Sequence, residues 1–147
     1  MIHVAVCQVS LLVGDTPGNR AASLAAATEA ADAGAAIIVL PELAHSGYVF
    51  ASPAEARAAA ERPDGPTVSG WAELAASRDV IVIGGFAELG EDGLLYNSAV
   101  LADPGGLRAI YRKAHLWHAE ADFFEPGSDP PPVVETEHGR IAVMICY

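Results

Sequence analysis

Short β-branched runs alternate with alanine-rich stretches along this chain, and that alternation constrains the fold more than any other feature. Apolar runs of strand length occupy residues 3–9, 36–40 and 79–85, and good helix formers fill 19–33, 53–62 and 67–77. Strands that alternate with helices favour an α/β protein in which helices cover a sheet. We predict a single domain over residues 1–147, because this length is too short for two.

The second half of the chain contains a predicted hairpin and ends in an apolar run. Residues 94–101 and 107–111 flank Asp103-Pro104-Gly105-Gly106, a sequence typical of a hairpin turn. A proline-rich loop follows at 126–132, and we predict a last strand over 141–147. Core strands seldom end a protein without a polar tail, so we expect a chain that stops before its fold is complete. A buried C-terminal strand is the alternative.

Charge narrows the range of partners. The chain has 8 Lys and Arg against 19 Asp and Glu, a net charge of −11. Contacts with phosphate need clustered Lys and Arg, so we predict no nucleic-acid partner and no anionic membrane partner. No apolar stretch reaches bilayer length, and the N-terminus lacks the basic segment of a secretory signal. We therefore expect a cytoplasmic protein with reduced cysteines that acts on a small molecule.

Three extended apolar runs each lead to a reactive side chain, namely Glu42, Lys113 and Cys146. Sites in open α/β sheets form beyond the carboxyl ends of the strands, so these side chains can meet at one rim. A carboxylate can take the proton of a thiol and return it to a leaving group, while a lysine stabilises the oxyanion. The set indicates acyl transfer from a carbon–nitrogen bond. The competing interpretation is two surface residues and an inert core thiol.

Longer segments around these residues occur in one order along the whole chain. They are Val6-Cys7-Gln8, the stretch with Asp15 and Asn19, Gly34 to Leu43, Gly47-Tyr48, Tyr96-Asn97-Ser98-Ala99, Tyr111-Arg112-Lys113-Ala114-His115-Leu116, Phe124-Glu125-Pro126-Gly127 and Ile145-Cys146-Tyr147. In this order they resemble the nitrilase superfamily, the carbon–nitrogen hydrolases.

The resemblance implies a role for each matching residue. Glu42 matches the general base of the family, Lys113 the lysine that stabilises the tetrahedral intermediate, and Cys146 the nucleophile that forms a thioester. Glu120 falls where many members carry a second, structural glutamate. The backbone N–H of Tyr147 matches an oxyanion-hole donor, and Tyr48 is expected to line the substrate pocket. The resemblance implies no metal and no organic cofactor.

The resemblance also implies a fold and a substrate class. The family fold is an αββα sandwich whose second half follows the cysteine, so this chain corresponds to an incomplete, N-terminal part. We predict that the 147 residues alone are poorly folded or inactive, whereas the full-length form is a hydrolase and a homo-oligomer. Tyrosine after the cysteine favours the amidase and carbamoylase branches, because tryptophan commonly follows it in nitrilases. The expected substrate is a small amide, carbamoyl compound or nitrile.

Two other functions stay open at this point. One is a non-catalytic fragment or interaction module of the same family, and the other is a nitrilase-, glutaminase- or acyltransferase-type member. His115, His118 and Glu120 form a loose metal-ligand pattern, which we disfavour because a structural zinc site needs four well-spaced ligands. We interpret His45 as an ordinary loop residue and Cys7 as a core thiol, and we disfavour a Cys7–Cys146 disulfide.

Overall fold

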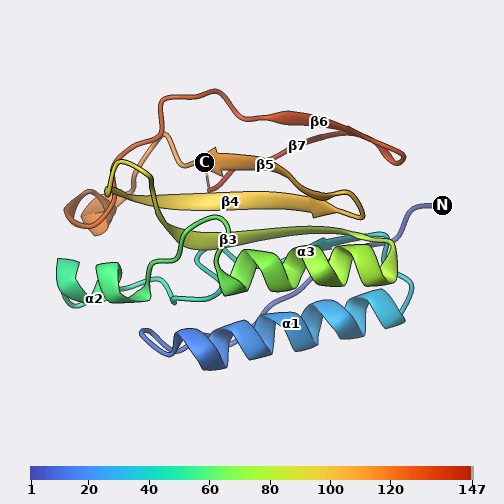
Figure 1. Ribbon diagram of the computed structural model, residues 1–147, viewed down its shortest axis with the longest axis horizontal. Coiled ribbons are helices and arrows are strands. Elements are labelled where there is room, and N and C mark those ends of the chain that lie inside the picture. Colours follow the sequence, from blue (N-terminus) through green and yellow to red (C-terminus); the bar gives the residue numbers. More distant parts are fainter. Residues whose placement is uncertain (147) are drawn as a thin grey trace.

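A five-stranded sheet organises the computed structural model, which describes residues 1–146 (Figure 1). Its strands are β1 (Val4–Val6), β2 (Ile37–Val39), β3 (Ile81–Leu89), β4 (Leu95–Asp103) and β5 (Gly106–Arg112). The other elements are α1 (Thr16–Asp32), α2 (Pro53–Ala59), α3 (Pro66–Arg78), the 3-10 helix η1 (His118–Asp122), β6 (Val133–Thr136) and β7 (Gly139–Ala142). The predicted α/β class is confirmed, and the predicted elements differ from these mainly at their ends.

The order and direction of the strands determine which chain segments meet where the strands end. The order is β1-β2-β3-β4-β5, with parallel pairing from β1 to β3 and antiparallel pairing from β3 to β5. It follows that β2, β3 and β5 run in the same direction and that their carboxyl ends lie on the same side of the sheet. The strand β4 begins on that side. Residues that follow β2 and β5, although far apart in sequence, are therefore neighbours.

One face of the sheet is covered by α1 and α3, which lie side by side in Figure 1. The Asp15 side chain caps α1 by accepting a hydrogen bond of 3.1 Å from the Gly18 N–H. Trp71 of α3 is fully buried, and its indole N–H donates to the Ser23 hydroxyl of α1 at 3.2 Å. Its ring contacts the sheet at Gly84, where any Cβ would lie 2.7 Å from a ring carbon. The alanine-rich α1 packs here against the sheet and α3, as predicted.

The opposite face of the sheet contacts the last part of the chain. A cluster of Ile81, Leu101 and Tyr111 packs against Val134, Val143 and Ile145. These last three residues come from the hairpin β6–β7, which lies above β5 in the view of Figure 1, and from the segment after it. Side chains that alternate along β3 and β4 thus supply two separate hydrophobic clusters, one on each face.

The prediction of one strand over residues 141–147 is correct only for Ile141 and Ala142 and is wrong for residues 143–146. The strand β7 ends at Ala142 and pairs only with β6, in a sheet of its own. After it, the Val143 N–H donates to the Pro132 carbonyl at 3.1 Å, outside any strand pairing. The side chains of Val143 and Ile145 bury themselves on the face of the main sheet, so packing rather than strand pairing holds this segment.

The predicted helix over 53–62 is also too long. It ends at Ala59, because Ala60 is extended and Glu61 forms a bridge with Glu88 of β3. Among residues 1–146, no helix combines the length and the apolar character that crossing a bilayer requires.

Candidate active site

Lys113 lies at the centre of a polar cluster beyond the carboxyl ends of β2 and β5. Its backbone is held on both sides, since its N–H donates to the Asn97 carbonyl at 2.8 Å and its carbonyl accepts from the Gly127 N–H at 2.9 Å. The side chain is 1% exposed. Its Nζ lies 2.9 Å from Glu42 Oε1 and 2.8 Å from Glu120 Oε1. The ammonium is thus buried between two carboxylates.

Glu42 reaches Lys113 because the chain after β2 runs tightly along β3. The Gly85 N–H donates to the Pro41 carbonyl at 3.1 Å, and the Ala44 N–H donates to the Gly85 carbonyl at 2.7 Å. A Cβ on Gly85 would lie 2.7 Å from Glu42 Cα, so only glycine allows this approach. Leu43, the next residue, has a φ of +50°, an uncommon conformation for a residue with a Cβ. The local backbone is therefore strained where Glu42 is placed.

Asn97 of β4 joins the two carboxylates and was not identified as a site residue from the sequence. Its Nδ2 lies 2.7 Å from Glu42 Oε1 and 3.2 Å from Glu120 Oε1. The side chain is fully buried. The one signal in the sequence is a polar residue inside a predicted strand, but its burial, which requires hydrogen-bond partners, is visible only in the structure.

Glu120 is the most fully hydrogen-bonded group of the cluster. Its Oε1 accepts from Lys113, Asn97 and the Tyr48 hydroxyl, the last at 2.8 Å, and its Oε2 accepts from the Trp117 N–H at 2.6 Å. Burial by itself raises the pKa of Glu120, but the hydrogen bonds from Lys113, Trp117 and Tyr48 outweigh it and lower the pKa. Glu120 therefore stays a carboxylate, as a structural partner of the lysine would.

The same contacts act on the two other ionisable groups of the cluster. Burial lowers the pKa of Lys113, but hydrogen bonds to Glu120 and Glu42 more than reverse this, so its pKa is raised and the ammonium persists. Burial, followed by the hydrogen bond to Glu120, raises the pKa of Tyr48 to about 12. Tyr48 also lines an apolar cavity of about 210 Å³ with Val49, Trp117 and Phe123.

Cys146 lies close to this cluster without a hydrogen bond to it. Cys146 and Glu42 both line a cavity of about 150 Å³, together with Gly85 and Ile145. Within residues 1–146, no hydrogen bond joins the thiol to Glu42 or Lys113. Cys146 is exposed and has a φ of +58°, so it is a second strained position beside the site. Strain of this kind is common at functional positions.

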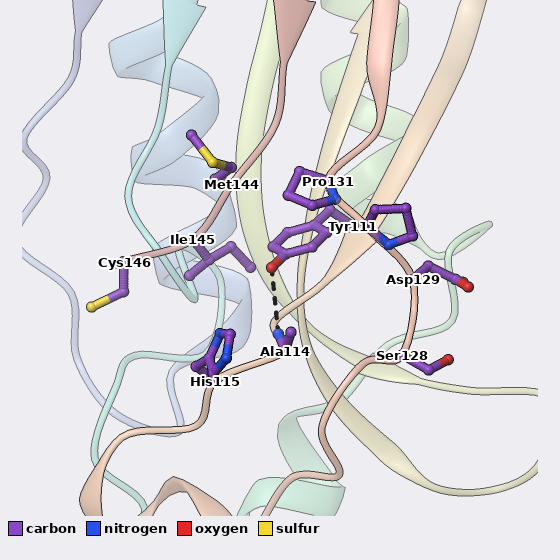
Figure 2. A pocket seen from close by; sticks show the side chains of 10 residues that line it. Tyr111, Ala114, His115, Ser128, Asp129, Pro131, Met144, Ile145 and Cys146 are labelled. Carbon is purple, nitrogen blue, oxygen red and sulfur yellow. Dashed lines mark hydrogen bonds between the residues drawn. The ribbon is translucent and has the colours of Figure 1, made fainter.

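A larger cavity of about 630 Å³ shares Met144, Ile145 and Cys146 with the cavity that Glu42 lines (Figure 2). Tyr111, His115, Asp129 and Cys146 line it, and the Tyr111 hydroxyl accepts a hydrogen bond of 3.4 Å from the Ala114 N–H. In Figure 2 the sulfur of Cys146 is directed away from the Tyr111 ring. Cys146 therefore contributes to two adjoining cavities, one of which also contains Glu42.

The structure brings together most of the residues singled out in the sequence. Glu42, Lys113, Glu120 and Tyr48 form one hydrogen-bonded cluster, and Cys146 shares a cavity with Glu42. Tyr147 lies outside the described residues. The catalytic roles of Glu42, Lys113 and Cys146 stay predictions.

Two residues outside the cluster bear on the sequence interpretations. His45 is fully buried and its Nε2 lies 2.8 Å from the Ala59 carbonyl, so it packs in the interior rather than serving as an ordinary loop residue. Cys7 is partly buried against the helix-covered core, and burial, followed by the charge of Glu29, raises the pKa of its thiol. Both cysteines are free thiols.

A thiol, a buried ammonium and a partly exposed carboxylate are groups that enzymes use in acyl transfer. The carbon–nitrogen hydrolase family model matches residues 3–147, and the chain belongs to that family.

Individual relatives agree with this assignment. The chain is 35% identical over 148 residues to a nitrilase from Pyrococcus abyssi, covering 100% of this chain and 56% of that protein. It is 39% identical over 135 residues to an (R)-stereoselective amidase from Pseudomonas sp, and the match covers 91% of this chain and 47% of that protein. The chain thus spans about half the length of these curated relatives.

A solved structure shows the same fold. A glutamate-to-glutamine variant of the amidase from Nesterenkonia sp. AN1, with acrylamide added to its active-site cysteine, matches with a TM-score of 0.80 at 25% identity. The match covers 100% of this chain and 58% of that chain. The α/β arrangement described above is therefore that of part of a nitrilase-superfamily amidase, as expected from the sequence.

Proposed function

We propose that this chain carries the Glu-Lys-Cys site of a hydrolase that cleaves an amide-type carbon–nitrogen bond. The observation that carries the proposal is the placement of Glu42, which contacts Lys113 at 2.9 Å and lines one cavity with Cys146. The Nesterenkonia amidase supports the assignment of a reactive cysteine, since acrylamide adds to that enzyme's active-site cysteine.

In the proposed reaction, Glu42 removes the proton of the Cys146 thiol and the sulfur attacks the carbonyl carbon of the amide. The carbon–nitrogen bond then breaks, and the leaving amine takes the proton from Glu42. The product on the protein is a thioester. Glu42 next removes a proton from water, and the resulting hydroxide attacks the carbonyl carbon of the thioester. The carbon–sulfur bond breaks, the sulfur takes the proton back from Glu42, and the acid leaves. Every proton moves through a single carboxylate.

Lys113 has the hydrogen atoms required for its proposed role. An ammonium has three donors, and Glu42 and Glu120 accept two of them. The third can bind the oxygen that becomes negative when the sulfur adds to the carbonyl. The raised pKa of Lys113 keeps the ammonium charged, so it stabilises this oxyanion rather than acting as a nucleophile.

The finer assignments are part of the proposal. We infer a small amide or carbamoyl substrate rather than a nitrile, with the Tyr147 N–H as a further oxyanion donor and Tyr48 at the pocket wall. The single domain over residues 1–147, the cytoplasmic location and the homo-oligomeric full-length form stay predictions.

Thiol alkylation tests the site without a known substrate. The assay uses the full-length form. With iodoacetamide near neutral pH, Cys146 should react faster than Cys7, and Glu42→Gln should slow Cys146 while the rate of Cys7 stays unchanged. Because exposure alone favours Cys146, the effect of Glu42→Gln is the decisive result. Glu91→Gln, at an exposed position, is the matched control. An unchanged Cys146 rate in Glu42→Gln would favour a non-catalytic module.

A further inference from the structure

We propose that Asn97 is a positioning residue that donates one amide proton to each carboxylate of the site and thereby leaves a single oxygen of Glu42 free to act as the base. This inference rests on the function proposed above. It concerns a residue that lies beside, and does not belong to, the Glu-Lys-Cys set. The contacts of its Nδ2 with Glu42 at 2.7 Å and Glu120 at 3.2 Å carry it.

Counting protons shows why an asparagine suits this position. A primary amide has two N–H donors on one nitrogen, and here each has a different carboxylate as its acceptor. Lys113 binds the same two oxygen atoms from its own side. The Oε1 atoms of Glu42 and Glu120 are therefore each held by both Lys113 and Asn97, and the two carboxylates cannot rotate independently.

Charge explains why the second donor is neutral. Two carboxylates beside one ammonium leave a net negative charge in a site where Lys113 and Glu120 are buried. The two carboxylates contact the same ammonium, so they repel each other unless hydrogen bonds stabilise their charges. Another cation in place of the amide would bind Glu42 more tightly and lower its affinity for the thiol proton. The amide of Asn97 stabilises both carboxylates without adding charge.

The arrangement also determines which oxygen of Glu42 is available. Oε1 accepts from Lys113 and Asn97, whereas Oε2 has no hydrogen-bond partner within residues 1–146. The Glu42 side chain is 26% exposed and lines the cavity that Cys146 lines. By contrast, both oxygens of Glu120 are occupied. Of the two carboxylates, only Glu42 is thus able to accept a proton from a thiol or a water.

The strand geometry links Asn97 to Lys113 as well. The backbone carbonyl of Asn97 accepts the Lys113 N–H, so one residue of β4 holds the main chain of the lysine and the side chains of its two partners. Ser98, the next residue, points to the opposite face and donates to Glu88 at 2.6 Å. Ser98 is equally buried and also bonds a glutamate, which makes it a matched control.

The test is the pH dependence of Cys146 alkylation by iodoacetamide in Asn97→Asp, Asn97→Ser and Ser98→Ala. Asn97→Asp replaces the donor with a third carboxylate. We therefore expect the acid limb of the rate profile to shift to a higher pH by about one unit, so that the alkylation rate at a fixed pH on that limb falls by about tenfold. Asn97→Ser retains one donor and should move the profile less, in the same direction. Ser98→Ala should lower the urea midpoint of unfolding and leave the profile unchanged.

Each outcome separates the possibilities. If Asn97→Asp and Asn97→Ser lower the urea midpoint without moving the profile, Asn97 has only a structural role and the inference is wrong. If Asn97→Asp does not fold, the profile of Asn97→Ser decides by itself. If Glu42→Gln has no effect on Cys146 in the same assay, the proposed function fails and the inference about Asn97 fails with it. If Glu42→Gln slows Cys146 but neither Asn97 variant moves the profile, the inference alone is wrong.

Discussion

Gly85→Ala should disturb the site more than any other single methyl group added to the sheet. The new Cβ would lie 2.7 Å from both Glu42 Cα and the Leu43 nitrogen, and 2.9 Å from the Pro41 carbonyl oxygen. All three are backbone atoms, so no flexible side chain can move aside. To reach an ordinary contact of 3.4 Å, the segment with Glu42 must shift by about 0.7 Å away from β3.

That shift has two measurable consequences. Overpacking of a tight interior costs about 1–3 kcal/mol of the free energy of unfolding. For a domain of this size, this lowers the melting temperature by about 2 to 12 °C. Misplacement of a reacting group by about 1 Å costs roughly a hundredfold in rate. We therefore expect the Glu42-dependent part of the Cys146 alkylation rate to fall by about tenfold to a hundredfold.

Gly84→Ala is the control, because it adds a similar clash on the other face of the same strand. There the Cβ would lie 2.7 Å from the Trp71 ring, and its three nearest neighbours are all atoms of that ring rather than backbone atoms of the segment with Glu42. Thermal unfolding followed by circular dichroism should show both variants destabilised, whereas alkylation should be slowed only in Gly85→Ala. Equal alkylation rates in the two variants, or a Gly85→Ala protein as stable as the unsubstituted one, would refute the reasoning.

Three further predictions concern stability. Burial lowers the pKa of His45, so the fold favours its neutral form and the free energy of unfolding should fall as the pH drops below about 6.5. His45→Gln should remove this pH dependence, and melting curves from pH 7.5 to 5 with an unchanged pH dependence would contradict the prediction. Trp71→Ala should cost about 3–5 kcal/mol in urea unfolding, whereas the exposed Trp117→Ala should cost within about 0.5 kcal/mol; similar costs would be inconsistent with the described packing. Arg112→Met should cost about 3 kcal/mol, because it leaves the buried Glu88 without its cation and with the Ser98 hydroxyl as its remaining donor, and a neutral effect would count against that ion pair.

Much of the fold could be predicted from the sequence because its signals are local. The β-branched runs, the alanine-rich stretches and the hairpin turn each depend on a few neighbouring residues, and the corresponding elements are present. The relation of Glu42 to Lys113 was also predictable, since both follow strands that end at one edge of the sheet. The details of their contact were not, because they depend on the tight passage of the chain along Gly85.

Two features of the site could not be predicted from local patterns. The apolar run before Cys146 has the composition of a strand, but its residues pack on a sheet face that is assembled from distant segments, so β7 ends at Ala142. Asn97 has no recognisable spacing to the other site residues. Its contact with Glu120 depends on the pairing of β4 with β5 and on the position of the segment that carries Glu120, and both are tertiary features.

The amino-acid sequence by itself determined the α/β class, the order of the elements and the chemical groups available for catalysis. These follow from short-range periodicity, turn residues and side-chain type. Only the tertiary structure decided which of those groups touch, how their protons are shared and which oxygen of Glu42 stays free. Those properties depend on distances of a few ångströms between residues up to 72 positions apart, and chain packing alone sets such distances.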